Sequence, residues 1–519
     1  MNTVERQNRP EPMYGWNDLP WREIEGRVFK LQKRIYRASR RGDVEAVHKL
    51  QRLLMNSWSA KCLAVRKVTQ DNRGKRTAGV DGVASLTPRQ RLKLAEGLAL
   101  KGKARPVRRV RIPKPGSKNG ETRPLGIPTM HDRALQALAK LALEPEWEAR
   151  FEPNSYGFRP GRSCHDAVEA IFASIRYLPK YVLDADINKC FDRIDHQALL
   201  GKISTYPSLR RVIRTWLKAG IMDGANLFPT EEGTPQGGVL SPLLANIALH
   251  GLEQAVESAF PKVIYRNGGK IQSWRPRVVR YADDFVILHR DLEVIERARE
   301  IAQQWLRDMG LELKPSKTSV THTLHPCGGK VGFDFLGFNI RQFPVGRSHR
   351  GTTGGRGQAS LEFKTIIRPS TEAVKRHYKE MARVVNAHKA APQGALIARL
   401  NPLVTGWRNY YSTVISKKVF SKLDHLVCRK LLRWAKRRHP HQSRRATVRK
   451  YWTPEQTPKW DFRAKDGTRL KPYVDAPIKR HTKVEGDRSP YDGDWVYWTT
   501  RLGKNPLISP RTATLLKIQ

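Results

Sequence analysis

Two adjacent carboxylates lie between two apolar runs in the middle of the chain. The segment Tyr281-Ala282-Asp283-Asp284 follows Val278-Val279-Arg280 and precedes Phe285-Val286-Ile287-Leu288. This pattern predicts a strand, a tight turn and a second strand. Neighbouring acids in apolar surroundings repel each other and are poorly solvated, and a divalent cation between them relieves both costs. An ordinary solvated turn is the other interpretation, because Asp is a favoured turn residue.

A third acid ends another apolar strand far upstream. Asp186 closes the run Tyr181-Val182-Leu183-Asp184-Ala185-Asp186. Carboxylates at the ends of strands are what a two-metal site for nucleotidyl transfer needs. The backbone carbonyl of the next residue, Ile187, would be a further metal ligand. Phe191 begins the following element, where its ring would either collide with the 2′-hydroxyl of a nucleotide or pack in the core.

Two further segments carry groups that suit a nucleotide. Gly233-Thr234-Pro235-Gln236-Gly237-Gly238 precedes a predicted helix; its glycines permit close backbone approach, and Gln236 can hydrogen-bond a ligand. Between Lys101 and Lys114, seven of fourteen residues are basic and alternate with Val and Ile, which predicts a strand with one cationic face. Lys114 and Arg123 could reach a triphosphate, or they could be ordinary surface charges.

The composition points to a polyanionic partner. The 519 residues include 96 Lys and Arg against 48 Asp and Glu, a formal net charge of +48. Nucleic acid and an anionic membrane both fit this excess. The chain starts without the apolar core of a signal peptide, and no window approaches the roughly 18 apolar residues of a membrane span, so nucleic acid is favoured. The five cysteines contain no CxxC pair, so we expect neither a disulfide framework nor a zinc site. We expect the protein to work in the reducing cytosol.

The pattern along the chain predicts several parts. A basic helical region comes first, and a mixture of helices and strands follows from residue 125 to 340. The later features are a helix with a core-facing stripe over 295–309, two short strands about Gly337, a Gly-rich linker at 345–358, and three amphipathic helices over about 370–438. The run from Arg429 to Lys450 has ten basic residues and no acid, which fits a nucleic-acid contact better than a solvated face. Residues 451–519 are rich in Trp, Tyr and Pro and form a small appended region.

Taken together, the motifs resemble those of bacterial group II intron-encoded reverse transcriptases, which also act as splicing maturases. The acidic strand, the Gly-rich loop and the YADD turn occur in the order found in reverse transcriptases. The segments that resemble the intron-encoded branch are Arg123-Pro124-Leu125-Gly126-Ile127-Pro128, Tyr156-Gly157-Phe158-Arg159-Pro160-Gly161-Arg162-Ser163, Phe335-Leu336-Gly337-Phe338 and Leu403-Val404-Thr405-Gly406-Trp407-Arg408-Asn409-Tyr410-Tyr411.

The resemblance implies an α+β fold. We expect a right-hand polymerase, with fingers and a palm that contains an antiparallel sheet, followed by an α-helical thumb that is also the maturase domain, domain X. The implied parts are a basic helical N-terminal extension (1–60), fingers and palm (61–362), thumb and domain X (363–450) and a DNA-binding region (451–519).

It also implies an RNA-directed DNA polymerase. Asp186, Asp283 and Asp284, with the Ile187 carbonyl, would hold two Mg²⁺ ions. Deoxynucleoside triphosphates would be added to a DNA primer on an RNA template. In the nucleotide site, Phe191 would exclude ribonucleotides, Gln236 would contact the incoming nucleotide, and Lys114 and Arg123 would steady its phosphates.

A second activity follows from the same resemblance. Such proteins bind their own group II intron RNA, assist its splicing, and insert it into target DNA by target-primed reverse transcription. Many relatives continue into a Cys- and His-rich endonuclease, but no paired cysteines follow Cys428, so second-strand cleavage is not expected of this chain. We expect a bacterial cytoplasmic protein that is nucleoid-associated when bound to target DNA.

Three alternatives stay open at this point. The chain could be a splicing maturase with little or no polymerase activity, although the three intact acids argue against it. It could be a reverse transcriptase of another lineage, such as a retron, which the helical region after residue 365 disfavours. It could also be an RNA-dependent RNA polymerase, which Phe191 opposes.

Overall fold

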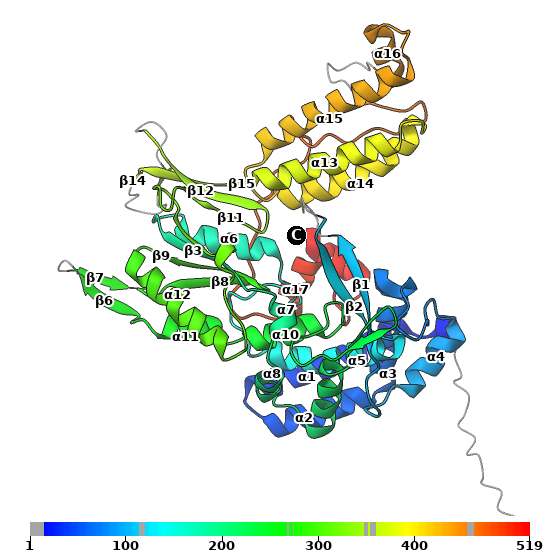
Figure 1. Ribbon diagram of the computed structural model, residues 1–519, viewed down its shortest axis with the longest axis vertical. Helices are drawn as coiled ribbons and strands as arrows, with labels where there is room; N and C mark the ends of the chain where they lie inside the picture. Colours follow the sequence, from blue (N-terminus) through cyan, green and yellow to red (C-terminus); the bar gives the residue numbers. More distant parts are fainter. Residues whose placement is uncertain are drawn as a thin grey trace, which may run out of the picture.

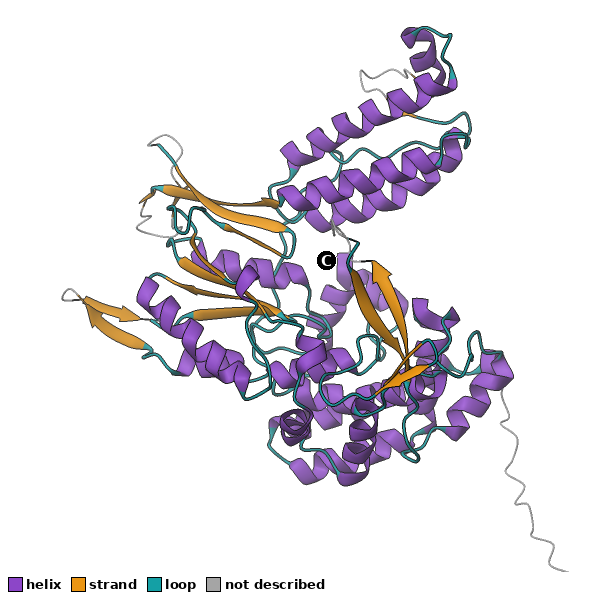
Figure 2. Ribbon diagram, viewed as in Figure 1, coloured by secondary structure: helices purple, strands orange, loops and turns teal. Residues whose placement is uncertain are grey.

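The computed structural model describes residues 15–113, 120–266, 269–272, 274–346, 351–352, 360–453 and 461–518. Lys114, predicted to contact nucleotide phosphates, lies outside these residues, as does most of the Gly-rich linker predicted at 345–358. Helices dominate both ends of the chain and the strands gather between them (Figure 2). Within the described residues, no helix is both long and apolar enough to cross a bilayer.

The N-terminal part is a set of helices around one buried helix. Helices α1 (Trp21–Arg40), α2 (Val44–Asn56) and α3 (Trp58–Arg66) all pack against α5 (Met130–Glu148), and α4 (Pro88–Gly97) packs on α3. The predicted basic helical region is thus helical, and its apolar stripe is buried on α5. Because α3 runs across residues 60 and 61, the border predicted there falls inside a helix. Short turns complete this part: η1 (Trp16–Asp18), η2 (Lys67–Asp71) and η3 (Arg73–Arg76).

The cationic segment forms the predicted strand. β1 (Val107–Pro113) pairs antiparallel with β2 (Thr122–Ile127) and parallel with β4 (Ile221–Asp223), which pairs with β5 (Asn226–Phe228). Only Val107 of β1 is buried, and Ile112 is 45% exposed. The alternation of Val and Ile therefore does not build a core face, and the outer end of this ribbon is open to solvent.

A second sheet carries the acidic motifs. Its strand order is β10 (Ser319–His322), β3 (Tyr181–Asp186), β9 (Asp284–His289) and β8 (Arg277–Tyr281), and all neighbours are antiparallel. Helix α12 (Leu292–Arg307) covers it through the buried side chains of Ile295, Ala298 and Ala302, as its periodicity predicts. The remaining elements of this region are α6 (Cys164–Ile175), α7 (Cys190–Arg193), α8 (His196–Ile203), α9 (Pro207–Leu217), α10 (Ser241–Leu249), α11 (Leu252–Ser258), β6 (Val263–Arg266), β7 (Gly269–Gln272) and η4 (Pro315–Lys317).

A third sheet joins this region to a helical bundle. β11 (Phe333–Phe335) and β12 (Phe338–Pro344) are the two strands predicted about Gly337, and β15 (Phe363–Pro369) pairs with β12. The border predicted at 362/363 therefore stands beside β15, and the helices begin only at Thr371. The small pair β13 (Gly351–Thr352) and β14 (Ser360–Leu361) lies between β12 and β15 in sequence.

The three predicted amphipathic helices are present and project from the rest of the molecule (Figure 1). They are α13 (Thr371–Ala387), α14 (Gln393–Tyr411) and α15 (Lys417–Arg438), followed by α16 (Arg444–Tyr451). The face predicted for the last long helix is its buried face: Phe420, Leu423, Val427, Leu431 and Trp434.

The C-terminal segment returns from the bundle to the N-terminal half of the molecule (Figure 1). After the pair β16 (Trp452–Thr453) and β17 (Asp461–Phe462), it runs without regular structure to α17 (Trp495–Leu502) and α18 (Pro510–Ile518). Tyr473 packs on the bundle, where it stacks edge-on against His377, whereas Asp487 pairs with Arg40 of α1 at 2.8 Å. This segment thus contacts both the helical bundle and the N-terminal helix α1.

Candidate active site

The acidic turn is a tight hairpin. Tyr281 of β8 pairs with Asp284 of β9, which leaves only Ala282 and Asp283 in the turn. Ala282 has a φ of 59°, in the left-handed region that costs an L-residue roughly 1–2 kcal/mol. The flanking strands stabilise the turn, because β9 is buried from Phe285 to His289.

The third acid faces this hairpin across the sheet. β3 pairs with β9 so that Asp186 lies directly opposite Asp284. Carboxylates from two distant segments therefore meet at one end of the sheet, beside Asp283 in the turn. Like charges at opposed positions destabilise a sheet, so this arrangement calls for a positive partner.

The environment of these carboxylates favours either their protonated form or pairing with a cation. Burial raises the pKa of Asp284 to about 7, and repulsion from Asp283 and Asp186 adds to the effect. Burial also raises the pKa of Asp283, with Asp186 contributing. The Lys317 ammonium lies 2.6 Å from Asp186 Oδ2, and this carboxylate raises the lysine pKa. A cation thus already sits at the edge of the acid group.

These residues suit a divalent metal by their chemistry, although not as a preformed cage. Within the described residues, no three His, Cys, Asp or Glu side chains converge closely enough to hold an ion as they stand. Clustered, partly buried carboxylate oxygens are nevertheless ligands of the kind that Mg²⁺ prefers. The Lys317 ammonium on Asp186 marks where positive charge is needed.

The hydrogen bonds on either side of Ile187 fix the direction of its carbonyl. The neighbouring Asp186 carbonyl accepts from Lys314 N at 2.8 Å, and Asn188 N donates to the Glu312 carbonyl at 2.9 Å. Both groups point to residues 312–314. Because successive carbonyls of an extended chain alternate in direction, the Ile187 carbonyl points the other way.

A buried polar network supports the hairpin from behind. The Arg280 guanidinium, 3% exposed, donates from Nη1 to Asn246 Oδ1 and to the Ala282 carbonyl, both at 3.2 Å. Asn246 Nδ2 donates to the Gly157 carbonyl at 2.7 Å. A Cβ added to Gly157 would stand 2.3 Å from Ala282 N. The turn is thus wedged between a buried arginine and the backbone of a glycine.

A cleft of about 830 Å³ opens beside the acids. Asp186, Asp283 and Lys317 lie at one side of it, and the predicted nucleotide contacts Arg123, Ile187, Phe191 and Gln236 also line it. The structure therefore brings these predicted residues to one cavity. Asp284 is adjacent through its pairing with Asp186.

Polar side chains cross this cleft in a chain. Arg123 Nε donates to Gln236 Oε1 at 2.7 Å, and Gln236 Nε2 donates to Asp192 Oδ1 at 3.1 Å. Burial raises the pKa of Asp192, and the bond from Gln236 opposes this. Phe191 is 8% exposed and packs edge-on against Phe158, with ring centroids 6.3 Å apart.

The Gly-rich loop is fixed against two neighbours. Gly126 N of β2 donates to the Gln236 carbonyl at 2.6 Å. A Cβ at Gly237 would stand 2.6 Å from the Gly126 carbonyl, and one at Gly233 would stand 2.6 Å from the Asp192 backbone. Both glycines have positive φ, 121° and 82°. Glycine is needed here for close packing, and this packing sets the position of Gln236.

Comparisons with known sequences agree with this geometry. Residues 112–340 match the family described as reverse transcriptase (RNA-dependent DNA polymerase). Residues 16–98 match the N-terminal domain of reverse transcriptase, and residues 374–452 match the group II intron, maturase-specific domain. Protein YkfC of Escherichia coli is 33% identical over 326 residues, which are 56% of this chain and 83% of YkfC.

The chain belongs to the group II intron-encoded reverse transcriptase/maturase family.

Other relatives of this family align over a smaller share of their length. The group II intron-encoded protein LtrA of Lactococcus lactis is 33% identical over 299 residues, 46% of this chain and 47% of LtrA. An uncharacterized 91 kDa protein in a cob intron of Schizosaccharomyces pombe is 27% identical over 383 residues, 62% of this chain and 45% of that protein. The chain thus spans about half of each. It contains an RNA-directed DNA polymerase domain and a splicing-associated maturase domain.

Three charged residues that the sequence pattern did not indicate also lie at this cleft. They are Lys317, which pairs with Asp186; Asp192, which accepts from Gln236; and Arg109, which lines the cleft. No periodicity distinguishes these residues from surface charges. Their roles arise from contacts between segments far apart in sequence.

The segment Tyr156–Ser163 links the site to the C-terminal segment. Gly157 touches the acidic hairpin, whereas Arg162 Nη2 donates to the Gly486 and Arg488 carbonyls at 3.0 and 3.1 Å. Just beyond it, fully buried Asp166 accepts from Arg501 Nη2 at 2.6 Å. Although burial opposes it, bonding to His481 and the charge of Arg501 hold the pKa of Asp166 well below its usual range.

Proposed function

We propose that this protein polymerises DNA on an RNA template with two Mg²⁺ ions held by Asp186, Asp283 and Asp284. The observation that carries this proposal is the register that sets Asp186 opposite Asp284, with Asp283 in the turn beside a cleft of about 830 Å³. The direction of the Ile187 carbonyl supports it as a further ligand. When bound, such ions lower the pKa of the primer 3′-hydroxyl and neutralise the charge of the triphosphate.

The chain's own groups would do the positioning. Arg123 would leave Gln236 and place its planar fork on the triphosphate, and Lys114 would add a second positive charge. Gln236 would then donate to the incoming nucleotide. Phe191, which lines the cleft, would leave no room for a 2′-hydroxyl. Catalysis by alignment needs little acid–base chemistry from side chains.

We further propose that the sheets and the bundle form a right hand. The β1–β2 ribbon would act as fingers, the sheet of β3 and β8–β10 as the palm, and α13–α15 as the thumb. Figure 1 supports this division, because the bundle and the ribbon project on the same side of the palm sheet. A DNA primer paired with its RNA template would lie between them.

The maturase role would be served by binding the intron RNA. The basic run Arg429–Lys450 spans the end of α15 and α16, and most of its Lys and Arg are exposed. With the N-terminal helices it would form the RNA-binding surface and assist splicing. Lys and Arg that neutralise phosphates make binding strongly salt-dependent.

The same protein would then act in intron mobility. Residues 451–519 would contact target DNA, which would associate the protein with the bacterial nucleoid, and the target would prime reverse transcription. The return of this segment to α1 and α6 supports the idea, because DNA held there would lie next to the polymerase domain.

Primer extension on an RNA template with deoxynucleotides and Mg²⁺ tests the proposal. We expect full-length cDNA from the parent and none from Asp283→Ala, with RNA binding retained by both. A parent that folds and binds intron RNA yet makes no product would reduce the function to that of a splicing maturase. Synthesis by Asp283→Ala would refute the metal assignment.

A further inference from the structure

A second cavity, of about 440 Å³, lies between α1 and the C-terminal segment. It shares no lining residue with the polymerase cleft. Phe29 and Lys33 come from α1, and the other walls are Pro490, Gly493, Trp495, Asn505, Leu507, Ile508, Ser509 and Thr512. Its volume is at the lower end of the roughly 300–1,000 Å³ typical of small-molecule sites. It suits one flat ring system better than an extended chain.

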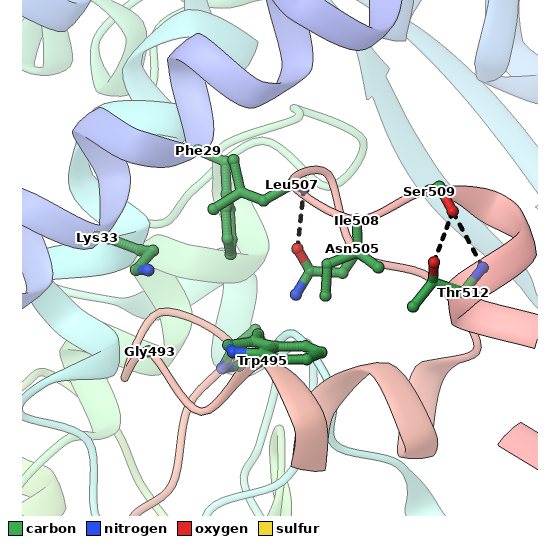
Figure 3. Close-up of a pocket in the computed structure, with 10 residues that line it drawn as sticks. Phe29, Lys33, Gly493, Trp495, Asn505, Leu507, Ile508, Ser509 and Thr512 are labelled. Carbon is green, nitrogen blue, oxygen red and sulfur yellow. Dashed lines mark hydrogen bonds between the residues drawn. The ribbon is translucent and has the colours of Figure 1, made fainter. Parts of the chain in front are cut away.

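Two aromatic side chains line this cavity on opposite sides (Figure 3). Phe29 is held by Tyr491, whose ring centroid lies 6.0 Å away. Trp495, at the start of α17, leaves 47% of its surface exposed. An exposed tryptophan opposite a second ring is an open stacking surface, and stacking on aromatic side chains tolerates any nucleobase.

The Asn505 amide offers a donor to the cavity. Asn505 Oδ1 accepts from Leu507 N at 2.9 Å, which fixes the amide orientation and turns Nδ2 toward the space between the rings (Figure 3). Ser509 Oγ is engaged by Thr512 N at 3.0 Å. None of the lining residues is Asp or Glu. A ligand here would therefore offer acceptor atoms.

Positive charge surrounds one end of the cavity. From Arg22 to Arg41, α1 and its cap carry eight Lys and Arg against two Glu. Gly493 lies beside two of these basic side chains: a Cβ added to Gly493 would be 3.2 Å from Arg37 Nη2 and 4.0 Å from Lys33 Cε. An anion attached to the stacked ring would meet these cations.

The nearby acids are used within the protein. Asp487 pairs with Arg40 at 2.8 Å. Asp494 Oδ1 accepts from Tyr497 N at 3.0 Å, and Asp492 Oδ2 accepts from Trp498 Nε1 at 3.2 Å. These interactions hold the three carboxylates against α1 and α17.

We infer that this cavity binds one unpaired base of a single-stranded RNA segment. The base would stack on Trp495 with Phe29 across the cavity, a ring carbonyl would accept from Asn505 Nδ2, and the adjoining phosphate would lie near Lys33 and Arg37. The inference rests on the RNA binding proposed above. It adds to it a discrete base-binding site that bridges α1 and the C-terminal segment.

Crosslinking of the full chain gives a direct test. A single-stranded 20-nucleotide RNA with 4-thiouridine is irradiated on the protein, and the attached peptides are mapped. We expect attachment at Phe29 or Trp495. Attachment only elsewhere would overturn the inference. Uridine monophosphate is added as a competitor; if it removes the crosslink at concentrations that leave strand binding intact, the cavity is a mononucleotide site and the RNA-base assignment fails.

Affinity variants complete the test. Trp495→Ala should weaken binding of this RNA about tenfold, in the range of one lost base stack, whereas Trp495→Phe should restore most of it. Tyr265→Ala, which removes an exposed aromatic side chain from β6 (77%), is the control and should bind as the parent does. Asn505→Asp keeps the acceptor for Leu507 N but removes the donor, and should also weaken binding.

Equal affinity of Trp495→Ala and Tyr265→Ala would overturn the inference. Primer extension by the parent, measured in parallel, separates the two proposals. If the parent extends primers and binds RNA while the cavity variants change nothing, the base site is wrong and the polymerase stands. If the parent does not bind RNA, both fail.

Discussion

Gly157 is the residue that allows the acidic hairpin to sit where it does. Its missing side chain leaves room for the Ala282 and Tyr281 backbone, which an added Cβ would approach to 2.3 and 2.9 Å. If residue 157 carried a Cβ, the two main-chain segments could not both keep their positions. The position of Asp283 is therefore tied to a glycine from a different part of the chain.

Gly157→Ala should lower the rate of DNA synthesis about 100-fold, because a shift of the acids by about an ångström costs that much in an aligned site. The measurement is single-turnover primer extension. Gly201→Ala is the matched control, since nothing lies within 4 Å of the Cβ it adds on α8. A Gly157→Ala enzyme with parental rate would show that the hairpin position does not limit catalysis.

Phe191 should determine the choice of sugar. Phe191→Ala opens space beside the cleft and should lower the preference for deoxynucleotides at least tenfold, within the roughly 1–3 kcal/mol available from one steric contact. Phe191→Tyr keeps the bulk and should retain selectivity. Competition between ribo- and deoxynucleoside triphosphates gives the ratio, and an unchanged ratio in Phe191→Ala would return this ring to a purely structural role.

At the scale of elements, the bundle of α13–α15 carries a buried histidine. His377 of α13 stacks on Trp407 of α14 at 4.9 Å, and its Nε2 lies 2.6 Å from the Tyr473 hydroxyl. Burial lowers its pKa to about 4. Since its ordinary pKa is about 6.5, the unfolded chain binds a proton in this range that the folded bundle does not.

The free energy of unfolding should therefore fall as the pH drops from about 6.5 to 4, by up to about 1.4 kcal/mol per pH unit from this residue. Above pH 6.5 this contribution is constant. Denaturant melts of the parent and of His377→Gln at several pH values measure it, and the variant should show a shallower decline. Parallel curves for the two proteins would contradict the assignment.

Local sequence patterns predicted the strands and turn that hold the site. Contacts between segments far apart in sequence determine how these elements are placed relative to one another. The strands on either side of Asp283 and the strand ending at Asp186 are confirmed, because apolar runs and turn residues act over a few positions. The register that opposes Asp186 and Asp284 depends on packing between segments far apart in sequence. For the same reason, spacing alone could not place Lys317 beside Asp186.

At the scale of the molecule, the C-terminal segment connects the helical bundle with the N-terminal half of the protein. Asp166 of α6 is fully buried and accepts from Arg501 of α17, while Val484 N donates to it at 2.8 Å. The Tyr156–Ser163 segment lies between this contact and the acidic hairpin. The C-terminal segment and the acidic hairpin are thus connected by a short, mostly buried stretch of chain.

Removal of Arg501 should release this segment. Arg501→Ala leaves the buried Asp166 carboxylate without its main cation and should cost about 3–5 kcal/mol, seen as faster hydrogen exchange over residues 480–518. Arg480→Ala breaks a more exposed ion pair with Glu169 and should cost no more than about 1 kcal/mol. Equal exchange in the two variants would show that the buried pair does not hold the segment.

The central claim is that Asp186, and not merely an acid on β3, serves the polymerase. Asp184 lies two residues earlier on the same face of that strand, and burial, then Asp334 and Asp186, raise its pKa to about 6. The most direct measurement compares cDNA synthesis by Asp186→Asn and Asp184→Asn on an RNA template with Mg²⁺. We predict at least a 1,000-fold loss for Asp186→Asn, as for removal of a group that acts in the transition state, and a change of less than about fivefold for Asp184→Asn. Equal rates in the two variants, or parental synthesis by Asp186→Asn, would contradict the account.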